Sequence, residues 1–280
     1  MNTPRFLYHA SAVGVAGEVR RPFQQVIHCQ ASSALPRYGG HAHSRVDKFQ
    51  LADIVKHSAC FTHATGIYNK ETDSFETTVQ STVADIDVRG VVTADLTTAK
   101  VHSNHPNKPG VEPSITVEGS EIKGLRVAGR VIDLEPRVNI YCEHTTLSGL
   151  RKYYSENKQF QQDFESEAFV DNEAKLPEDV LHFFPWRRRK SSTDLHHHNN
   201  MVIVPLYKVK NPSERGFEVY GNVIKVHDFG RVHIGELIIE GNRRRVMMLH
   251  VDMGSPCEGC VSFSCGDGNG GQVPPPDGGV

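Results

Sequence analysis

The amino-acid sequence predicts a mainly β protein, an antiparallel β-sandwich or β-roll with a small helical insertion. The first observation is that residues 76–134 are dense in β-branched residues and alternate between apolar and polar side chains, as strands with one buried face do. The second is that single glycines punctuate this stretch where turns or bulges are expected. The third is that strand patterns lie on both sides of one polar segment with helical spacing, residues 147–190.

The chain before residue 76 predicts several short strands joined by turns. Residues 5–30 predict one or two strands separated near residues 20–22. Pro36 and the pair Gly39-Gly40 predict a turn, because proline and glycine favour turn conformations. The two strands and the hairpin turn expected next are residues 43–52, 53–68 and 71–74.

Two similar units follow, residues 82–99 and 120–134. Each reads as a short strand, a glycine turn and a second short strand, with Gly90 in the first unit and Gly124 and Gly129 in the second. Two copies are too few for a solenoid, which needs at least about three stacked units. We therefore expect two neighbouring hairpins in one sheet.

A helical insertion is expected after a short strand at residues 138–143. Apolar side chains recur at helical spacing over residues 147–164, and Thr146 or Ser148 is placed to cap the start of that helix. Residues 177–185 predict a second short helix, opened by one proline and ended by another.

Strand patterns return after the insertion and are followed by a glycine-rich segment. Gly241-Asn242 predicts a tight hairpin turn between the last two long strands. The organisation we predict is a single β-rich domain over residues 1–265, with the insertion at about 147–190, and a flexible Gly/Pro-rich tail over residues 266–280. The strands expected here are residues 201–209, 217–226, 230–239 and 244–252.

Charge and hydropathy argue against several classes of function. The chain holds 31 Lys and Arg against 33 Asp and Glu, a net charge of −2. Nucleic-acid-binding proteins normally carry an excess of basic residues, so this balance argues against that function. No apolar run approaches the roughly 18 residues of a membrane span. Residues 7–19 are interrupted by polar side chains and lack the basic start of a signal peptide, so they predict a strand, and the expected location is cytoplasmic.

Three of the six cysteines form the sharpest local pattern. Cys257 and Cys260 make a CxxC motif with Cys265 close behind, and two thiolates on one tight turn can share a zinc ion or carry out redox chemistry. A strand context favours inert thiols over redox catalysis. Zinc is the one cofactor that this pattern suggests. The candidates for the fourth ligand of a zinc site are His250, which we predict, and Asp252 or Asp267.

A basic segment beside the one tryptophan is a candidate polyanion-binding site. It would hold phosphate groups or an acidic partner, and the alternative is a solvated turn. The sequence contains no nucleophile elbow, zinc-protease or P-loop motif, so no catalytic residue is predicted. The residues of the basic segment are Trp186, Arg187, Arg188, Arg189 and Lys190.

Residues 82–99 together with residues 119–129 resemble a recurrent β-rich bacterial unit, found in proteins labelled "choice-of-anchor" and in hypothetical proteins. Residues 219–221, 229–232 and 268–270 resemble a longer, uncharacterised bacterial family of the same type. The resemblance implies a β-rich fold and carries over no catalytic residues.

These observations predict a non-enzymatic structural or self-assembling β protein that forms a homo-oligomer. Many alternating strands leave edges that can pair between subunits. The alternative is a metal-binding protein or an enzyme with a site between the sheet and the helical insertion, and its best candidate residues are His41, His43, Cys257 and Cys260.

Overall fold

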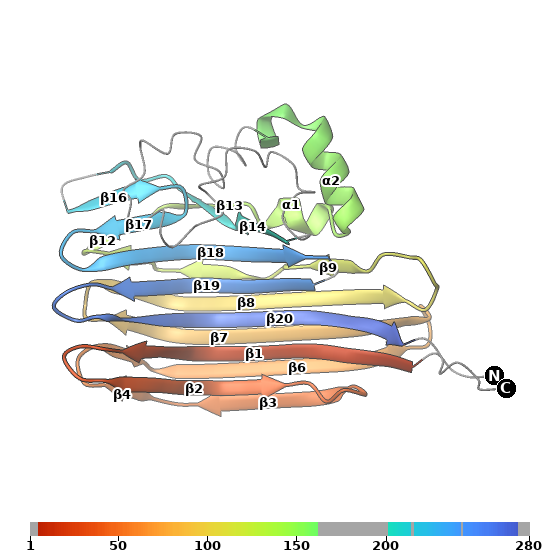
Figure 1. The fold of residues 1–280 in the computed structure, drawn as a ribbon, viewed down its shortest axis with the longest axis horizontal. Helices are drawn as coiled ribbons and strands as arrows, with labels where there is room; N and C mark the ends of the chain where they lie inside the picture. The colour runs from red at the N-terminus through yellow and green to blue at the C-terminus, as the bar shows by residue number, and fades with distance from the viewer. Residues whose placement is uncertain (1–4, 162–200, 214–215, 242, 274–280) are drawn as a thin grey trace.

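Two large antiparallel sheets face each other in the protein (Figure 1). The computed structural model describes residues 5–161, 201–213, 216–241 and 243–273. Sheet 1 contains β1 (Arg5–Val19), β2 (Gln25–Ala34), β14 (Met201–Pro205), β16 (Phe217–Tyr220), β17 (Val223–Val226), β18 (Gly230–Glu240), β19 (Arg243–Met253) and β20 (Gly259–Val273). Sheet 2 contains β3 (Gly40–Val46), β4 (Phe49–Leu51), β5 (Val55–His57), β6 (Ala59–Asn69), β7 (Ser74–Val88), β8 (Val92–Pro106), β9 (Ser114–Thr116), β10 (Glu121–Lys123), β11 (Arg126–Val127) and β12 (Arg130–Val131). A small pair joins β13 (Leu134–Pro136) to β15 (Tyr207–Val209).

The strand order places segments that are distant in sequence side by side. Sheet 1 runs β16-β17-β18-β19-β20-β1-β2, with β14 beside β18. In sheet 2, β7 pairs with β8 and β6, β6 pairs with β3, and β9, β10 and β11 all line the far edge of β8. This open sandwich of antiparallel sheets confirms the predicted fold class. The second predicted unit also lies beside the first, although it forms the short strands β10 to β13 and not a long hairpin.

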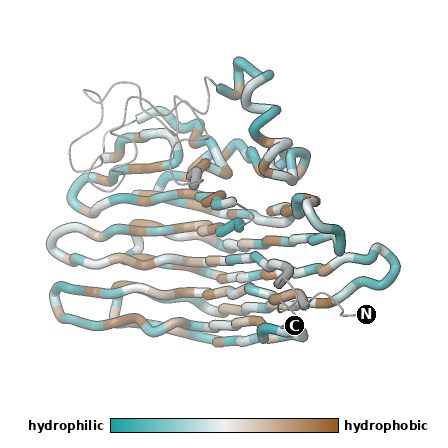
Figure 2. Tube along the Cα trace, turned by 45° about the vertical axis from the view of Figure 1, so that its right-hand side comes forward, coloured by the Kyte–Doolittle hydropathy of each residue, from teal (hydrophilic) through white to brown (hydrophobic). Residues whose placement is uncertain are grey.

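The core lies between the sheets because each long strand turns every second side chain inward. Along β7, Val79, Ser81 and Val83 are buried while Thr78 and Gln80 are half-buried on the other face. Figure 2 shows the resulting alternation of hydrophilic and hydrophobic residues along the strands. Buried side chains from before and after the helical segment belong to one continuous apolar cluster, so the flanking segments share one interior.

A line of interrupted pairing crosses sheet 1, and we call it the crease. The ladders pair residues on both sides of Gly235, Met248, Ser264, Gly14 and Ala31 but not at these five positions, which lie opposite one another on β18, β19, β20, β1 and β2. Every second side chain of each strand faces inward, and at the crease this set moves by one residue along the strand. All five strands shift at the same level, so each keeps a buried inner face on both sides of the line.

The two sheets approach each other closely at the crease. The Ser264 hydroxyl faces inward, lies 2.7 Å from the Thr97 hydroxyl of β8 and donates to the Thr97 carbonyl at 2.9 Å. On β1, a Cβ built on Gly14 would lie 1.7 Å from the Cys60 sulfur of β6, so only hydrogen fits there. Sheet 2 has a matching interruption at Asp85, whose φ of 51° lies in the left-handed region.

The expected flexible tail is wrong for residues 266–273. They form the second half of β20, which pairs with β1 on one side and with β19 on the other. Glycine-rich sequence is typical of loops, but here glycine makes room for the facing side chains. A Cβ on Gly268 would lie 3.0 Å from Val101, and one on Gly270 would lie 2.2 Å from the Phe6 ring. Residues 274–280 lie outside the described residues.

The short strand expected at residues 138–143 is also wrong, because these residues form helix α1 (Val138–Glu143). Val138 and Tyr141, three residues apart, are the buried pair, and the Tyr141 hydroxyl donates to the Pro205 carbonyl at 3.4 Å. Helix α2 (Leu147–Glu156) confirms the start of the predicted helix, and the Thr146 hydroxyl caps it by accepting from the Gly149 amide. The second predicted helix, at residues 177–185, lies outside the described residues.

None of the helices in the described part of the chain is long and apolar enough to cross a membrane.

Replacing Gly14 with alanine tests the close approach of the sheets. The added methyl group meets the Cys60 sulfur and, at 2.8 Å, the Gln30 carbonyl oxygen, so β1 has to move. We expect a loss of about 2–3 kcal/mol in the free energy of unfolding, the upper part of the usual range for overpacking. Denaturant unfolding measures it. Gly271→Ala, in the neighbouring strand β20 and with open space around its Cβ, is the matched control and should change stability by less than about 0.5 kcal/mol. Equal effects of the two substitutions would contradict the close packing.

Candidate functional site

The structure separates the three cysteines predicted to bind zinc. Cys257 is buried in the turn between β19 and β20, and Cys260 and Cys265 lie on β20. Five residues of strand separate these last two by roughly 16 Å, too far for one metal ion. Within the described residues no group of three or more His, Cys, Asp or Glu side chains is arranged to hold a metal. Burial raises the pKa of all three thiols, that of Cys265 to about 12, which favours the unreactive thiol form.

His250, the predicted fourth ligand, belongs instead to a chain of polar side chains on the outer face of sheet 1. We call this chain the histidine network: Glu236 and His233 on β18, Asp252 and His250 on β19, and Ser262 on β20. The Asp252 carboxylate binds both imidazoles, with its two oxygens 3.2 Å from His233 Nε2 and 3.1 Å from His250 Nε2. At one end His250 Nδ1 lies 2.7 Å from the Ser262 hydroxyl, and at the other His233 Nδ1 lies 3.6 Å from Glu236.

The strand register builds this network. His233 pairs with His250 across β18 and β19, and His250 pairs with Ser262 across β19 and β20, so the three side chains stand in one row. Asp252 is two residues from His250 and therefore points to the same face. The row lies one pair away from the buried row of Ile234, Leu249 and Phe263, which borders the crease.

The charges within the network are mutually stabilising. Burial lowers the pKa of His233, but hydrogen bonds and the negative charges of Asp252 and Glu236 outweigh it and leave the pKa raised. Burial raises the pKa of Asp252, but the hydrogen bonds from His233 and His250 outweigh it and hold that pKa well below its usual range. Asp252 is therefore an ionised carboxylate that accepts a hydrogen bond from each imidazole.

Sequence reasoning found His250 and Asp252 as neighbours of the CxxC motif but missed His233 and Ser262. A usable signal was present for His233. In a hairpin turning at Gly241-Asn242, paired residue numbers have a constant sum, and this places His233 opposite His250, as observed. Ser262 had no comparable signal, because the position of β20 beside β19 depends on the turn that follows Met253.

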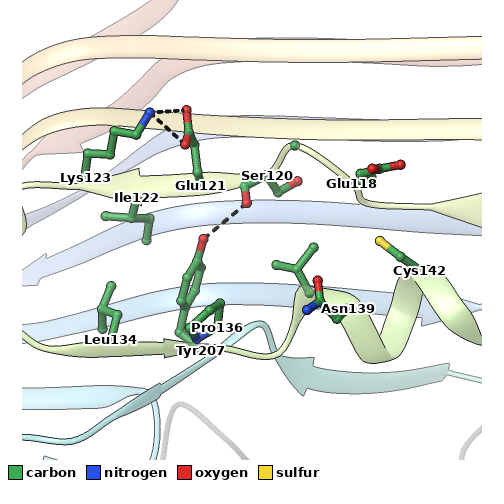
Figure 3. Close-up of a pocket in the computed structure, with 12 residues that line it drawn as sticks. Glu118, Ser120, Glu121, Ile122, Lys123, Leu134, Pro136, Asn139, Cys142 and Tyr207 are labelled. Atoms are coloured by element: carbon green, nitrogen blue, oxygen red, sulfur yellow. Dashed lines mark hydrogen bonds and ion pairs between the residues drawn. The ribbon is translucent and has the colours of Figure 1, made fainter.

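A cleft of about 440 Å³ lies between β10, the segment before it, β13 and α1 (Figure 3). The Tyr207 hydroxyl donates to the Ser120 carbonyl at 3.2 Å, and burial raises the pKa of Tyr207 to about 12. Lys123 and Glu121 form an ion pair at its rim, 2.9 Å apart. The remaining lining side chains include Glu118, Leu134, Pro136, Asn139 and Cys142.

The other predicted site residues belong neither to the histidine network nor to the cleft. Trp186, Arg187, Arg188, Arg189 and Lys190 lie outside the described residues, so the polyanion site stays a prediction. His41 and His43 are exposed on β3, on the opposite sheet from Cys257 and Cys260.

Asp252→Asn tests the network through the pH dependence of stability. A depressed carboxylate pKa stabilises the fold above about pH 4 and loses that effect in acid; a raised histidine pKa stabilises it below about pH 6.5 and loses it as the pH rises through the folded-state pKa. The two effects overlap between about pH 4 and 6.5, where the substitution should cost about 3 kcal/mol.

The cost should shrink towards pH 9. Denaturant unfolding at pH 5.5 and pH 9 measures both values, and Asp47→Asn, in an exposed ion pair with Arg45, should have little effect at either pH. An Asp252→Asn cost that grows towards pH 9 would contradict the assignment.

Comparisons with known proteins identify one family. No curated protein and no solved structure matches the chain. A family model described as a domain of unknown function, DUF8256, matches residues 6–240. The match ends at the last residue of β18, so His250, Asp252 and Ser262 lie beyond it. Because the match covers most of the chain, the protein belongs to the DUF8256 family.

Proposed function

We propose that the protein is a non-enzymatic structural protein that assembles with copies of itself through the edge formed by β2 and β3. The observation that supports this best is the position of the two sheet edges. Within the described residues, sheet 1 ends at β2 and β3 pairs with β6 alone, and β2 and β3 contact each other on one side of the sandwich (Figure 1). Both sheets therefore end together, and a second copy can extend them at one interface.

The composition of β2 supports pairing with another strand. Edge strands that avoid association carry charged residues, lysine above all, or proline. The strand sequence QVIHCQASSA contains none of Lys, Arg, Asp, Glu or Pro. Val26 on β2 is 54% exposed, and Phe23 just before it is 39% exposed. The uncharged strand β2 with exposed apolar side chains is suited to an ordered contact.

A second copy of the chain is the partner that this edge fits. An antiparallel pair of β2 strands around a two-fold axis joins identical surfaces, the commonest arrangement of homodimers. Such pairing would satisfy the outward backbone groups of both strands. It would also cover the exposed Val26 and Phe23 of both copies.

Val26→Lys should abolish the assembly, because it places a charge on each side of the paired edge. The chain mass is 31.1 kDa, so we expect light scattering to give a multiple of this value for the natural protein and the single-chain mass for the variant. Val111→Lys, in the loop after β8 and 50% exposed at the valine, is the matched control and should assemble normally. A natural protein that stays at the single-chain mass at high concentration would refute the proposal.

A second candidate function is small-molecule binding in the cleft beside Tyr207. Its volume of about 440 Å³ falls in the range of known ligand sites. Its lining combines apolar side chains with a tyrosine hydroxyl, an amide and an ion pair. It also lies near α1, close to where the alternative hypothesis expects a site, between the sheet and the helical insertion.

Filling the cleft tests this candidate. Asn139→Trp should remove any rise in melting temperature that a compound from a metabolite library gives to the natural protein. Asn104→Trp, on β8 away from the cleft, is the control and should keep it. A library that shifts no melting temperature, or shifts that survive Asn139→Trp, would argue against the candidate.

A further inference from the structure

We propose that Ser262 is an activated nucleophile, with His250 as its general base and Asp252 as the group that orients the base, and that it takes up acyl groups from small esters. This activity is separate from assembly through β2 and β3. Three roles have to be filled for such chemistry: a hydroxyl, a base in hydrogen-bond contact with it, and a third group that holds the base.

The distances meet those requirements on described residues alone. Ser262 Oγ lies 2.7 Å from His250 Nδ1, and His250 Nε2 lies 3.1 Å from Asp252 Oδ1. All three side chains stand on the adjacent, paired strands β19 and β20. A site on paired strands holds its geometry more firmly than one on loops.

The protonation pattern follows from the charge on Asp252. An ionised carboxylate has no proton to donate, so it accepts the Nε2–H of His250. A neutral imidazole with its proton on Nε2 has a free lone pair on Nδ1. That lone pair faces Ser262, and the serine hydroxyl donates to it. This is the arrangement that a general base needs before it removes the hydroxyl proton.

His233 acts as a positioning residue for the carboxylate. It binds the other oxygen of Asp252 at 3.2 Å, and its own side chain is 5% exposed. Asp252 is thus held by two imidazoles and cannot rotate away from His250 without losing a buried hydrogen bond. The side chains of His250 and Asp252 are 22% and 18% exposed, so the reacting end of the network is more open than the His233 end.

Four other hydroxyls among the described residues have different partners. Ser81 donates to the Val13 carbonyl, and Ser264 donates to the Thr97 carbonyl, both in the interior. Ser58 binds the Asp85 carboxylate directly. Thr78 lies 3.0 Å from His102 Nδ1 in sheet 2, which makes a hydroxyl–imidazole pair for which the structure gives no carboxylate contact.

The proposed step is acyl transfer to the serine. Ser262 Oγ forms a bond to the ester carbonyl carbon as its proton moves to His250 Nδ1. The bond from that carbon to the alcohol oxygen breaks, and the leaving alkoxide takes the proton from His250. Water then releases the acid by the same route. Ser262 lies in a strand paired on both sides, where ladder bonds occupy backbone N–H groups, so we expect both acylation and release to be slow.

A fluorophosphonate probe tests this on the intact protein. Its phosphorus–fluorine bond breaks as the serine oxygen attacks, and hydrogen fluoride leaves. We expect one label per chain by intact mass, mapped to the Ser262 peptide of the natural protein. Ser262→Ala should remove the label, and His250→Gln and Asp252→Asn should slow labelling by about 10²-fold, a typical contribution of general-base catalysis.

Thr78→Val is the matched control, since it removes a hydroxyl beside an imidazole outside the network, and its labelling should be unchanged. Far-ultraviolet circular dichroism checks that each variant is folded. Mapping on the natural protein needs no variant, so a folding defect cannot hide the result. Absence of label, a label on another residue, or equal rates for His250→Gln and the natural protein would each overturn the proposal. None of these outcomes bears on assembly through β2.

Discussion

The close approach of the two sheets along the crease constrains the rest of the structure. Side chains on a strand alternate with a period of two, so a shift on one strand alone would turn its apolar residues outward. Here five adjacent strands shift together, and small side chains at Gly14, Ala31 and Ser264 leave room for the facing sheet. The Ser264–Thr97 hydrogen bonds then join β20 to β8 across the interior. A buried hydroxyl that finds its partner in the opposite sheet favours one alignment of the sheets over others.

The same constraint shapes the outer face of sheet 1. On β18, β19 and β20 the residues between the inward-facing ones point to the outer face of the sheet. The histidine network occupies these outward positions. A fixed register on long paired strands holds His233, Asp252, His250 and Ser262 within hydrogen-bond reach of one another in sequence along the network, with Glu236 beside His233. The scaffold and the candidate chemistry thus depend on the same strand alignment. The resemblance to "choice-of-anchor" proteins stays a prediction, since the DUF8256 match carries no function.

Most of the fold could be predicted from local sequence patterns. The alternation of apolar and polar residues identifies strands with one buried face, and turn residues mark where those strands end. The hairpin turns at residues 71–74 and at Gly90 lie where expected. Prediction went wrong where a tertiary neighbour decided the outcome. Residues 266–273 carry a loop-like composition, yet β1 and β19 pair with them. Residues 138–143 alternate like a strand, yet burial of Val138 and Tyr141 selects a helix. The candidate site was predicted in part, since His250 and Asp252 are close in sequence while Ser262 joins them through sheet register.

The pairing of β1 with β20 has a consequence for the order in which the protein folds. Sheet 2 draws its strands from residues 40–131, a continuous stretch, so it can form as soon as that stretch has left the ribosome. Sheet 1 has to wait, because β20, one of the two neighbours of its first strand, is synthesised some 250 residues later. During that interval one apolar surface of sheet 2 has no cover, and a nascent chain in this condition is a natural client for a chaperone.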